Sequence, residues 1–144
     1  MAEINISQAE ADSLIAVHKK TLSDISLPIQ GEGVQIKVVS HDKKEEFIVD
    51  ISRGTIKLQK SKEQLRAREV VILLRLDIES SPHRNPDGTE ISGSHLHIYK
   101  ENLGDRFAIE IPRDKFTNTG NLIKTVEEFL RYCNIDVPKI QGSI

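Results

Sequence analysis

Hydrophobic and polar residues follow a helical period near both ends of the chain. Ser7 and Glu10 have the spacing of a capping box, and apolar residues then recur at three- and four-residue intervals. This pattern predicts an amphipathic helix over residues 8–20. A second stripe with helical spacing runs from about Asn121 to Tyr132 and predicts a second helix there.

Between these two helices the period changes to two, which is typical of β-strands. The alternation predicts six short strands, over residues 34–38, 47–51, 56–58, 70–78, 93–99 and 106–111. We interpret the polar, basic residues 61–69 as a connector and residues 139–144 as a loose tail. One helix, about six strands and a second helix follow in that order. The predicted fold class is therefore α+β, with an antiparallel sheet.

The length of 144 residues suits a single domain, 1–144, with an ordinary apolar core. The formal net charge is −2, so nucleic-acid binding would need a local basic patch. A single cysteine, Cys133, excludes an internal disulfide and a cysteine-based zinc site. The sequence contains no signal-peptide pattern and no apolar run that could span a bilayer, which predicts a cytoplasmic protein without a membrane partner. The oligomeric state stays open.

The segment from His95 to Tyr99 carries the clearest chemical signal. On a strand, His95, His97 and Tyr99 would point to one face, and Leu96 and Ile98 to the other. We expect the predicted strands 70–78, 93–99 and 106–111 to be neighbours, because strands joined by short turns usually pair. Their shared polar face would then lie in water and carry Arg75, Asp77, His95, His97, Tyr99 and Arg106. The loop with His83 and Arg84 could fold over its edge.

Such a face has the groups that metal-independent RNA cleavage requires. One base takes the 2′-hydroxyl proton, one acid protonates the leaving oxygen, and cations hold the charged phosphorus centre. Histidine titrates nearest neutral pH, so a pair of histidines can provide both proton transfers. The catalytic candidates are His95, His97, His83 and Tyr99, and the substrate-binding candidates are Arg75, Arg84, Arg106 and Asp77. A basic connector, with Lys57, Lys60, Lys62, Arg66 and Arg68, could follow an RNA backbone. This hypothesis needs no metal and no cofactor.

Two resemblances accompany this hypothesis. The element order over residues 8–111 loosely resembles the superfamily of barnase, EndoU, colicin E5 and RelE-type toxins, which places active residues on an antiparallel sheet behind an N-terminal helix. That resemblance implies a ribonuclease of toxin type, with an antitoxin or host protein as a possible partner beside RNA. The segment from Arg75 through His83-Arg84-Asn85-Pro86-Asp87-Gly88 to Tyr99 also resembles a small uncharacterised family found in bacteria and their phages.

Two other functions stay open at this point. His95, His97 and Glu101 have the spacing of the first cupin motif, and such ligands suit iron, manganese, nickel or zinc. The second cupin motif is absent, because no histidine follows His97. The polar face, or a spare edge strand, could instead cover the surface of a protein partner without any chemistry.

Overall fold

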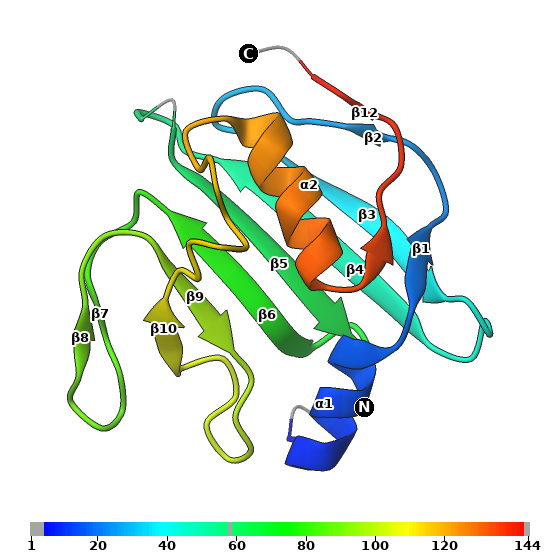
Figure 1. The fold of residues 1–144 in the computed structure, drawn as a ribbon, viewed down its shortest axis with the longest axis horizontal. Coiled ribbons are helices and arrows are strands. Elements are labelled where there is room, and N and C mark those ends of the chain that lie inside the picture. Colours follow the sequence, from blue (N-terminus) through cyan, green and yellow to red (C-terminus); the bar gives the residue numbers. More distant parts are fainter. Residues whose placement is uncertain (1–4, 58, 143–144) are drawn as a thin grey trace.

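The computed structural model describes residues 5–57 and 59–142, which are built around an eight-stranded sheet (Figure 1). The order across the sheet is β10-β9-β6-β5-β4-β3-β1-β11. All neighbours are antiparallel except β1 and β11, which are parallel. The strands are β1 Lys19–Thr21, β3 Gly33–Ser40, β4 Glu46–Arg53, β5 Ser61–Ala67, β6 Val71–Ile78, β9 His95–Ile98, β10 Ala108–Glu110 and β11 Ile135–Asp136.

Two helices and two small sheets complete the described chain. Helix α1 spans Gln8–Ala16, and helix α2 spans Leu122–Tyr132 and crosses one face of the large sheet (Figure 1). Strand β2 (Ile25–Ser26) pairs with β12 (Ile140–Gln141), and β7 (His83–Arg84) pairs with β8 (Glu90–Ile91). Neither described helix has the length and apolar character needed to cross a membrane. The predicted α+β class with a mainly antiparallel sheet is confirmed.

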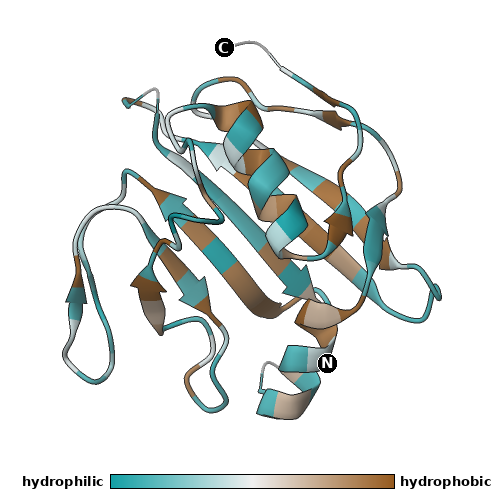
Figure 2. Ribbon diagram, viewed as in Figure 1, coloured by the Kyte–Doolittle hydropathy of each residue, from teal (hydrophilic) through white to brown (hydrophobic). Residues whose placement is uncertain are grey.

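The two faces of the sheet differ because side chains alternate along each strand. On the face covered by α2, Phe47, Val49 and Ile51 are buried in one apolar cluster that includes Val126 and Phe129 of the helix. On the opposite face, side chains in register across β4, β5, β6 and β9 are mostly polar. Figure 2 shows the alternation as hydrophobic and hydrophilic bands along these strands. The polar face forms two rows, Ser52–Lys62–Asp77–His95 and Asp50–Gln64–Arg75–His97.

The first helix is shorter than the sequence predicted. The side chain of Ser7 accepts a hydrogen bond from the amide of Glu10, as the capping box requires. The helix ends at Ala16, however, and Lys19 lies in strand β1. The ammonium of Lys19 is buried, where it donates to the carbonyls of Ile15, Val17 and Cys133 at 2.7, 2.9 and 2.7 Å. Burial lowers the pKa of Lys19 to about 8.

The central strands depart from the prediction in one place. Residues 61–67 form the fifth strand, β5, and not a connector. The expected strand over 56–58 is wrong where the structure describes it, since Ile56 is 92% exposed; Leu58 lies outside the described residues. Polar residues at the α2-facing positions Ser61 and Glu63 interrupt the apolar alternation of β5 and hide it from pattern analysis.

The expected loose tail is also wrong in part. Ile140 and Gln141 form β12 and pair with β2, so the chain is held in a parallel ladder up to this point. Residues 143 and 144 lie outside the described residues. The sheet has eight strands instead of about six, because the three-residue β1 and the two-residue β11 are too short to show a period.

Candidate functional site

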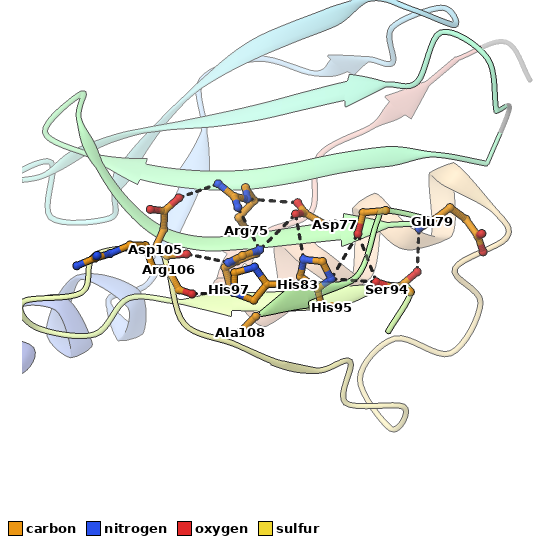
Figure 3. A network of polar contacts seen from close by, with 12 residues as sticks. Arg75, Asp77, Glu79, His83, Ser94, His95, His97, Asp105, Arg106 and Ala108 are labelled. Atoms are coloured by element: carbon orange, nitrogen blue, oxygen red, sulfur yellow. Dashed lines mark hydrogen bonds and ion pairs between the residues drawn. The ribbon is translucent and has the colours of Figure 1, made fainter. Parts of the chain in front are cut away.

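Register across β6 and β9 brings four polar side chains together. Asp77 lies directly opposite His95, and Arg75 lies opposite His97. Strand β10 pairs with β9 on the other side, so the predicted neighbourhood of these three strands is confirmed. Cβ atoms of directly opposite residues are about 4.5–5.5 Å apart, close enough for the side chains to touch. Figure 3 shows the four side chains converging beside the loop that follows β6.

That loop adds a third imidazole. His83 lies over the pair, with ring centroids 4.6 Å from His97 and 5.3 Å from His95, while the rings of His95 and His97 are 4.8 Å apart. Asn85 holds the loop in place. Its side-chain amide donates to the carbonyl of Ala108 at 2.9 Å and accepts from the amide of Ala108 at 2.7 Å. The loop is therefore fastened to strand β10 two residues from His83.

The cluster is buried, which contradicts the expected water-exposed face. His95 and His97 are 2% exposed and Asp77 is 6% exposed. The loop after β6 contacts the cluster through Ser80, whose hydroxyl is 3.4 Å from Nδ1 of His95, and through the ring of His83. All three imidazoles, Arg75 and Asp77 nevertheless line one pocket of about 410 Å³. The rings thus have few contacts with bulk water but share an opening.

Each imidazole gives one ring nitrogen to a backbone carbonyl. His95 Nδ1 is 2.9 Å from the oxygen of Gly93, and His97 Nδ1 is 2.7 Å from the oxygen of Asp105. His83 Nε2 is 2.8 Å from the oxygen of Arg106 (Figure 3). A carbonyl oxygen only accepts, so each of these ring nitrogens carries the proton. In a neutral ring the other nitrogen is then an acceptor: Nε2 in His95 and His97, and Nδ1 in His83.

These acceptors face a carboxylate. Oδ2 of Asp77 lies 3.3 Å from Nε2 of His95 and 3.3 Å from Nε2 of His97. Burial lowers the pKa of His95, against the hydrogen bond to Gly93 and the charge of Asp77, which raise it. A neutral His95 therefore presents a lone pair to a negatively charged oxygen. This arrangement calls for a cation among the three atoms.

Arg75 supplies part of that positive charge. Its guanidinium lies 2.7 Å from Oδ2 of Asp105, 3.3 Å from Oδ1 of Asp77 and 3.1 Å from Nε2 of His97. Burial raises the pKa of Asp77, but the contact with His97 and the charge of Arg75 outweigh it, so the pKa stays below its usual value. Nε of Arg75 and Oδ1 of Asp77 are buried without a hydrogen-bond partner among the described residues. The site is charged and incompletely satisfied.

Several predicted site residues lie elsewhere. The hydroxyl of Tyr99 bonds to the backbone of Ile6, at 2.8 Å from both its amide and its carbonyl, because the strand ends at Ile98 and the tyrosine ring packs in the core. The guanidinium of Arg106 turns to the carbonyls of Asn102 and Leu103, so only its backbone oxygen reaches the cluster.

Arg84 and Glu101 are also outside the cluster. Arg84 is exposed on the β7–β8 hairpin beside Glu90. Glu101 accepts from the amide of Gln8 at the start of α1, so the expected ligand set of His95, His97 and Glu101 is wrong. Structure thus brings together Arg75, Asp77, His83, His95 and His97, and separates Tyr99, Arg84, Arg106 and Glu101 from them.

Residues that the sequence reasoning missed hold the cluster in position. Asp105 binds Arg75 through its carboxylate and His97 through its carbonyl. Asn85 fastens the loop of His83, and Arg53 lines the same pocket. Lys60 and Lys62, which the sequence analysis placed in a basic connector, also line it. In the sequence, Asn85 stands out only as part of the segment that resembles an uncharacterised family. Its two-residue separation from His83 was the available signal.

Fold and site together define an α+β protein with a buried histidine–carboxylate cluster near one edge of an eight-stranded sheet. The chain belongs to DUF6978, a family described as being of unknown function, whose model matches residues 6–135. No curated protein and no solved structure was found to match the chain.

Proposed function

We propose that the protein binds a divalent transition metal through His83, His95, His97 and Asp77, with Zn²⁺ as the ion that fits best. The observation that carries this proposal is the direction of the imidazole protons. All three rings give an N–H to a backbone carbonyl and leave the other nitrogen as an acceptor. Metal-binding histidines in proteins are oriented in this way.

The distances support a tetrahedral ion. Zinc lies about 2.0–2.1 Å from nitrogen and about 2.0–2.2 Å from carboxylate oxygen, so two ligands of a tetrahedral site are about 3.3–3.4 Å apart. Oδ2 of Asp77 is 3.3 Å from both histidine Nε2 atoms. One ring nitrogen from each of the three histidines lies within 4.8 Å of those of the other two, so a modest inward shift of the rings completes the set.

A metal also satisfies the electrostatics of the buried cluster. The lone pairs of two imidazoles and the charge of one carboxylate converge away from bulk water. A divalent cation would bind these acceptors together, and at Nε2 of His97 it would replace the guanidinium of Arg75, which lies 3.1 Å from that nitrogen. Nitrogen and carboxylate ligands suit zinc and its neighbours in the first transition row. Since the ligands line a pocket, a bound ion would be accessible to a substrate.

Metal-independent RNA cleavage by His95 and His97 is a second candidate. The observation in its favour is the pairing of Asp77 with both imidazoles, next to the guanidinium of Arg75. A carboxylate that orients an imidazole is a common part of acid–base sites. In this mechanism the rings themselves move protons, so bound metal would block the reaction.

Metal titration of the chelator-treated protein tests the first proposal. Zn²⁺ binding is followed by calorimetry, and Co²⁺ binding by the visible absorption that tetrahedral cobalt gives. We expect one tight site in the parent protein and a loss of more than about 100-fold in affinity for His97→Ala, because a ligand is removed. His41→Ala, an exposed histidine outside the pocket, is the matched control. Circular dichroism and thermal unfolding verify that both variants fold.

Tight binding that survives His97→Ala, or is lost in His41→Ala, would show that the metal binds elsewhere. The same chelated protein is incubated with RNA. Cleavage without metal that disappears in a folded His95→Ala variant would replace the metal proposal by the acid–base one.

A further inference from the structure

The pocket above the histidine cluster has a strong excess of positive charge. Beside the histidines, its lining contains four cationic side chains, Arg53, Lys60, Lys62 and Arg75, and a single carboxylate, Asp77. The whole chain has a formal charge of −2, so this local balance departs from the average of the protein. Clefts lined by one sign of charge attract ligands of the other sign.

Three of these cations, Arg53, Lys60 and Lys62, form no ion pair among the described residues, and Arg53 donates instead to the carbonyl of Pro28 at 3.2 Å. The charge of Arg75 is shared between Asp77 and Asp105. Both lysines are exposed at the mouth of the pocket.

Register places one of these ammonium groups next to the metal ligands. Lys62 on β5 lies directly opposite Asp77 on β6, and Asp77 lies opposite His95 on β9. The three side chains form one row across the sheet. The charge of Lys62 contributes to the lowered pKa of Asp77, so the two groups interact across the strands.

We propose that this pocket binds a phosphate-bearing ligand between the metal ion and the ammonium groups of Lys60 and Lys62. This inference rests on the proposed metal site. Asp77 neutralises one of the two charges of the ion, so the net charge of metal and ligands remains positive. A phosphate group matches this combination because it is the anion that can bridge a metal ion and several cationic donors with its separate oxygens.

The pocket size agrees with a phosphate ester and not only with a free anion. A volume of about 410 Å³ falls within the range of ordinary small-ligand sites, about 300–1,000 Å³. A phosphate with an attached nucleoside fits this range, and a longer chain could leave through the open mouth. Ser52, Ser80 and Ser81 also line the pocket and provide hydroxyls for hydrogen bonds.

Binding to the zinc-loaded protein is measured for three probes: inorganic phosphate, a nucleoside 5′-monophosphate and a short single-stranded RNA. Calorimetry serves for the small probes and fluorescence anisotropy for the RNA. The test variant is Lys60→Gln combined with Lys62→Gln, and the control is Lys37→Gln, which removes an exposed lysine of β3 outside the pocket. We expect the double variant to weaken phosphate-probe binding about tenfold or more and the control to leave it unchanged. The control should keep the zinc affinity of the parent, and the double variant should bind zinc at least as tightly, because it lacks the positive charge of Lys62 beside Asp77.

The probes separate the sources of the phosphate. Tighter binding of the monophosphate than of RNA assigns the pocket to a small ester, and the reverse order assigns it to a nucleic acid; either result supports the proposal. Absence of binding by all three probes to protein that holds zinc overturns it and leaves the metal site intact. Equal binding by the double variant and the parent also overturns it. Failure of the parent to hold zinc is a separate result that removes the metal proposal.

Discussion

The described part of the chain contains two histidine–carboxylate clusters, one buried and one at the surface. His95 and His97 face Asp77 in a buried pocket, while His18 and His41 face Asp136 at the surface. The side chains of the surface cluster are 52%, 41% and 54% exposed. The imidazoles of His83, His95 and His97 lie close enough to one another to hold an ion, and so do the imidazoles of His18 and His41 with the carboxylate of Asp136.

The clusters differ in where the imidazole protons point. In the surface cluster, Nε2 of His18 and Nε2 of His41 lie 2.6 and 2.8 Å from the two carboxylate oxygens of Asp136. Such short contacts require both nitrogens to donate, and the rings stack with their centroids 3.9 Å apart. These hydrogen bonds lower the pKa of Asp136, that from His18 most. In the surface cluster, the ring N–H groups of His18 and His41 thus satisfy both oxygens of Asp136.

In the buried cluster, backbone carbonyls accept the ring protons, and the Nε2 atoms of His95 and His97 face Oδ2 of Asp77. Composition alone therefore does not decide which cluster binds a cation. The hydrogen-bond acceptor of each ring N–H matters as well. It determines which ring nitrogen keeps a lone pair that a cation can bind. The surface cluster has another effect: it ties the segment after α1, the β3–β4 turn and β11 together.

The two clusters should differ most in how zinc affinity responds when the carboxylate of each is replaced by an amide. For Asp77→Asn we expect zinc affinity to fall by about 100-fold or more, since an anionic ligand is lost. The metal-free variant should unfold at the same temperature as the parent or higher. An amide N–H can donate to Nε2 of His95, whereas the carboxylate oxygen only repels its lone pair. Metal titration and thermal unfolding of the metal-free protein measure the two effects.

Asp136→Asn is the matched control for this prediction. The surface carboxylate accepts hydrogen bonds and is exposed, so its loss should leave zinc affinity unchanged and lower the unfolding temperature only slightly. A fall in zinc affinity for Asp136→Asn but not for Asp77→Asn would reverse the roles that we assign to the clusters. A strongly destabilised metal-free Asp77→Asn protein would contradict the interpretation of the buried lone pairs.

Part of the fold was accessible from the sequence because two regular periods are visible in it. The helix at residues 122–132 and the long strand at residues 71–78 each bury a continuous apolar stripe, so both were predicted. Strand β5 was missed because Glu63 and Ser61 occupy positions that face the core. Residues 19 and 20 of strand β1 were assigned to the first helix. The buried ammonium of Lys19 donates to three backbone carbonyls, one of them on Cys133 far along the chain, and a local pattern cannot reveal such a contact.

The candidate site could also be predicted from the sequence only in part. Alternation put His95 with His97 and Arg75 with Asp77, and the expected pairing of neighbouring strands put all four on one face. Burial of this face could not be predicted, because it depends on how the loop after β6 folds back. The exclusion of Tyr99 depends on where β9 ends, and strand boundaries are set by tertiary contacts such as the bond to Ile6.

A substitution outside the proposed metal ligands should also weaken zinc binding by the buried cluster. Asn85→Ala removes both hydrogen bonds that fasten the loop of His83 to Ala108. We expect zinc affinity to fall about 10–100-fold, as is typical when a group that positions a ligand is lost. Asn118→Ala, in the turn before α2, is the control and should not change the affinity. Zinc titrations of the two folded variants make the comparison; equal affinities would show that His83 needs no anchoring by Asn85.

A third carboxylate, Glu63, is buried like Asp77 but forms no ion pair among the described residues. Glu63 lies on the α2-facing side of β5, and neither of its carboxyl oxygens has a hydrogen-bond partner among the described residues. Burial raises the pKa of Glu63 to about 8; the hydroxyl of Ser61 opposes this shift, and the negative charge of Asp77 adds to it. Glu63 and Asp77 thus show that burial shifts a carboxyl pKa upward unless imidazole and guanidinium groups oppose it.

The shift of Glu63 predicts a dependence of stability on pH. Its pKa is higher in the folded state than in the unfolded chain, so the native protein keeps a proton that the unfolded chain loses above about pH 4.5. This contribution is complete below the unfolded pKa and is lost as pH rises to about 8 and beyond. Glu63→Gln should therefore stabilise the protein by about 1 kcal/mol or more at pH 8, with a smaller gain at pH 5. Denaturant unfolding of chelator-treated parent and variant at both pH values measures the difference. A gain that does not grow with pH would mean that Glu63 is ionised in the native protein, in which case burial alone does not separate its behaviour from that of Asp77.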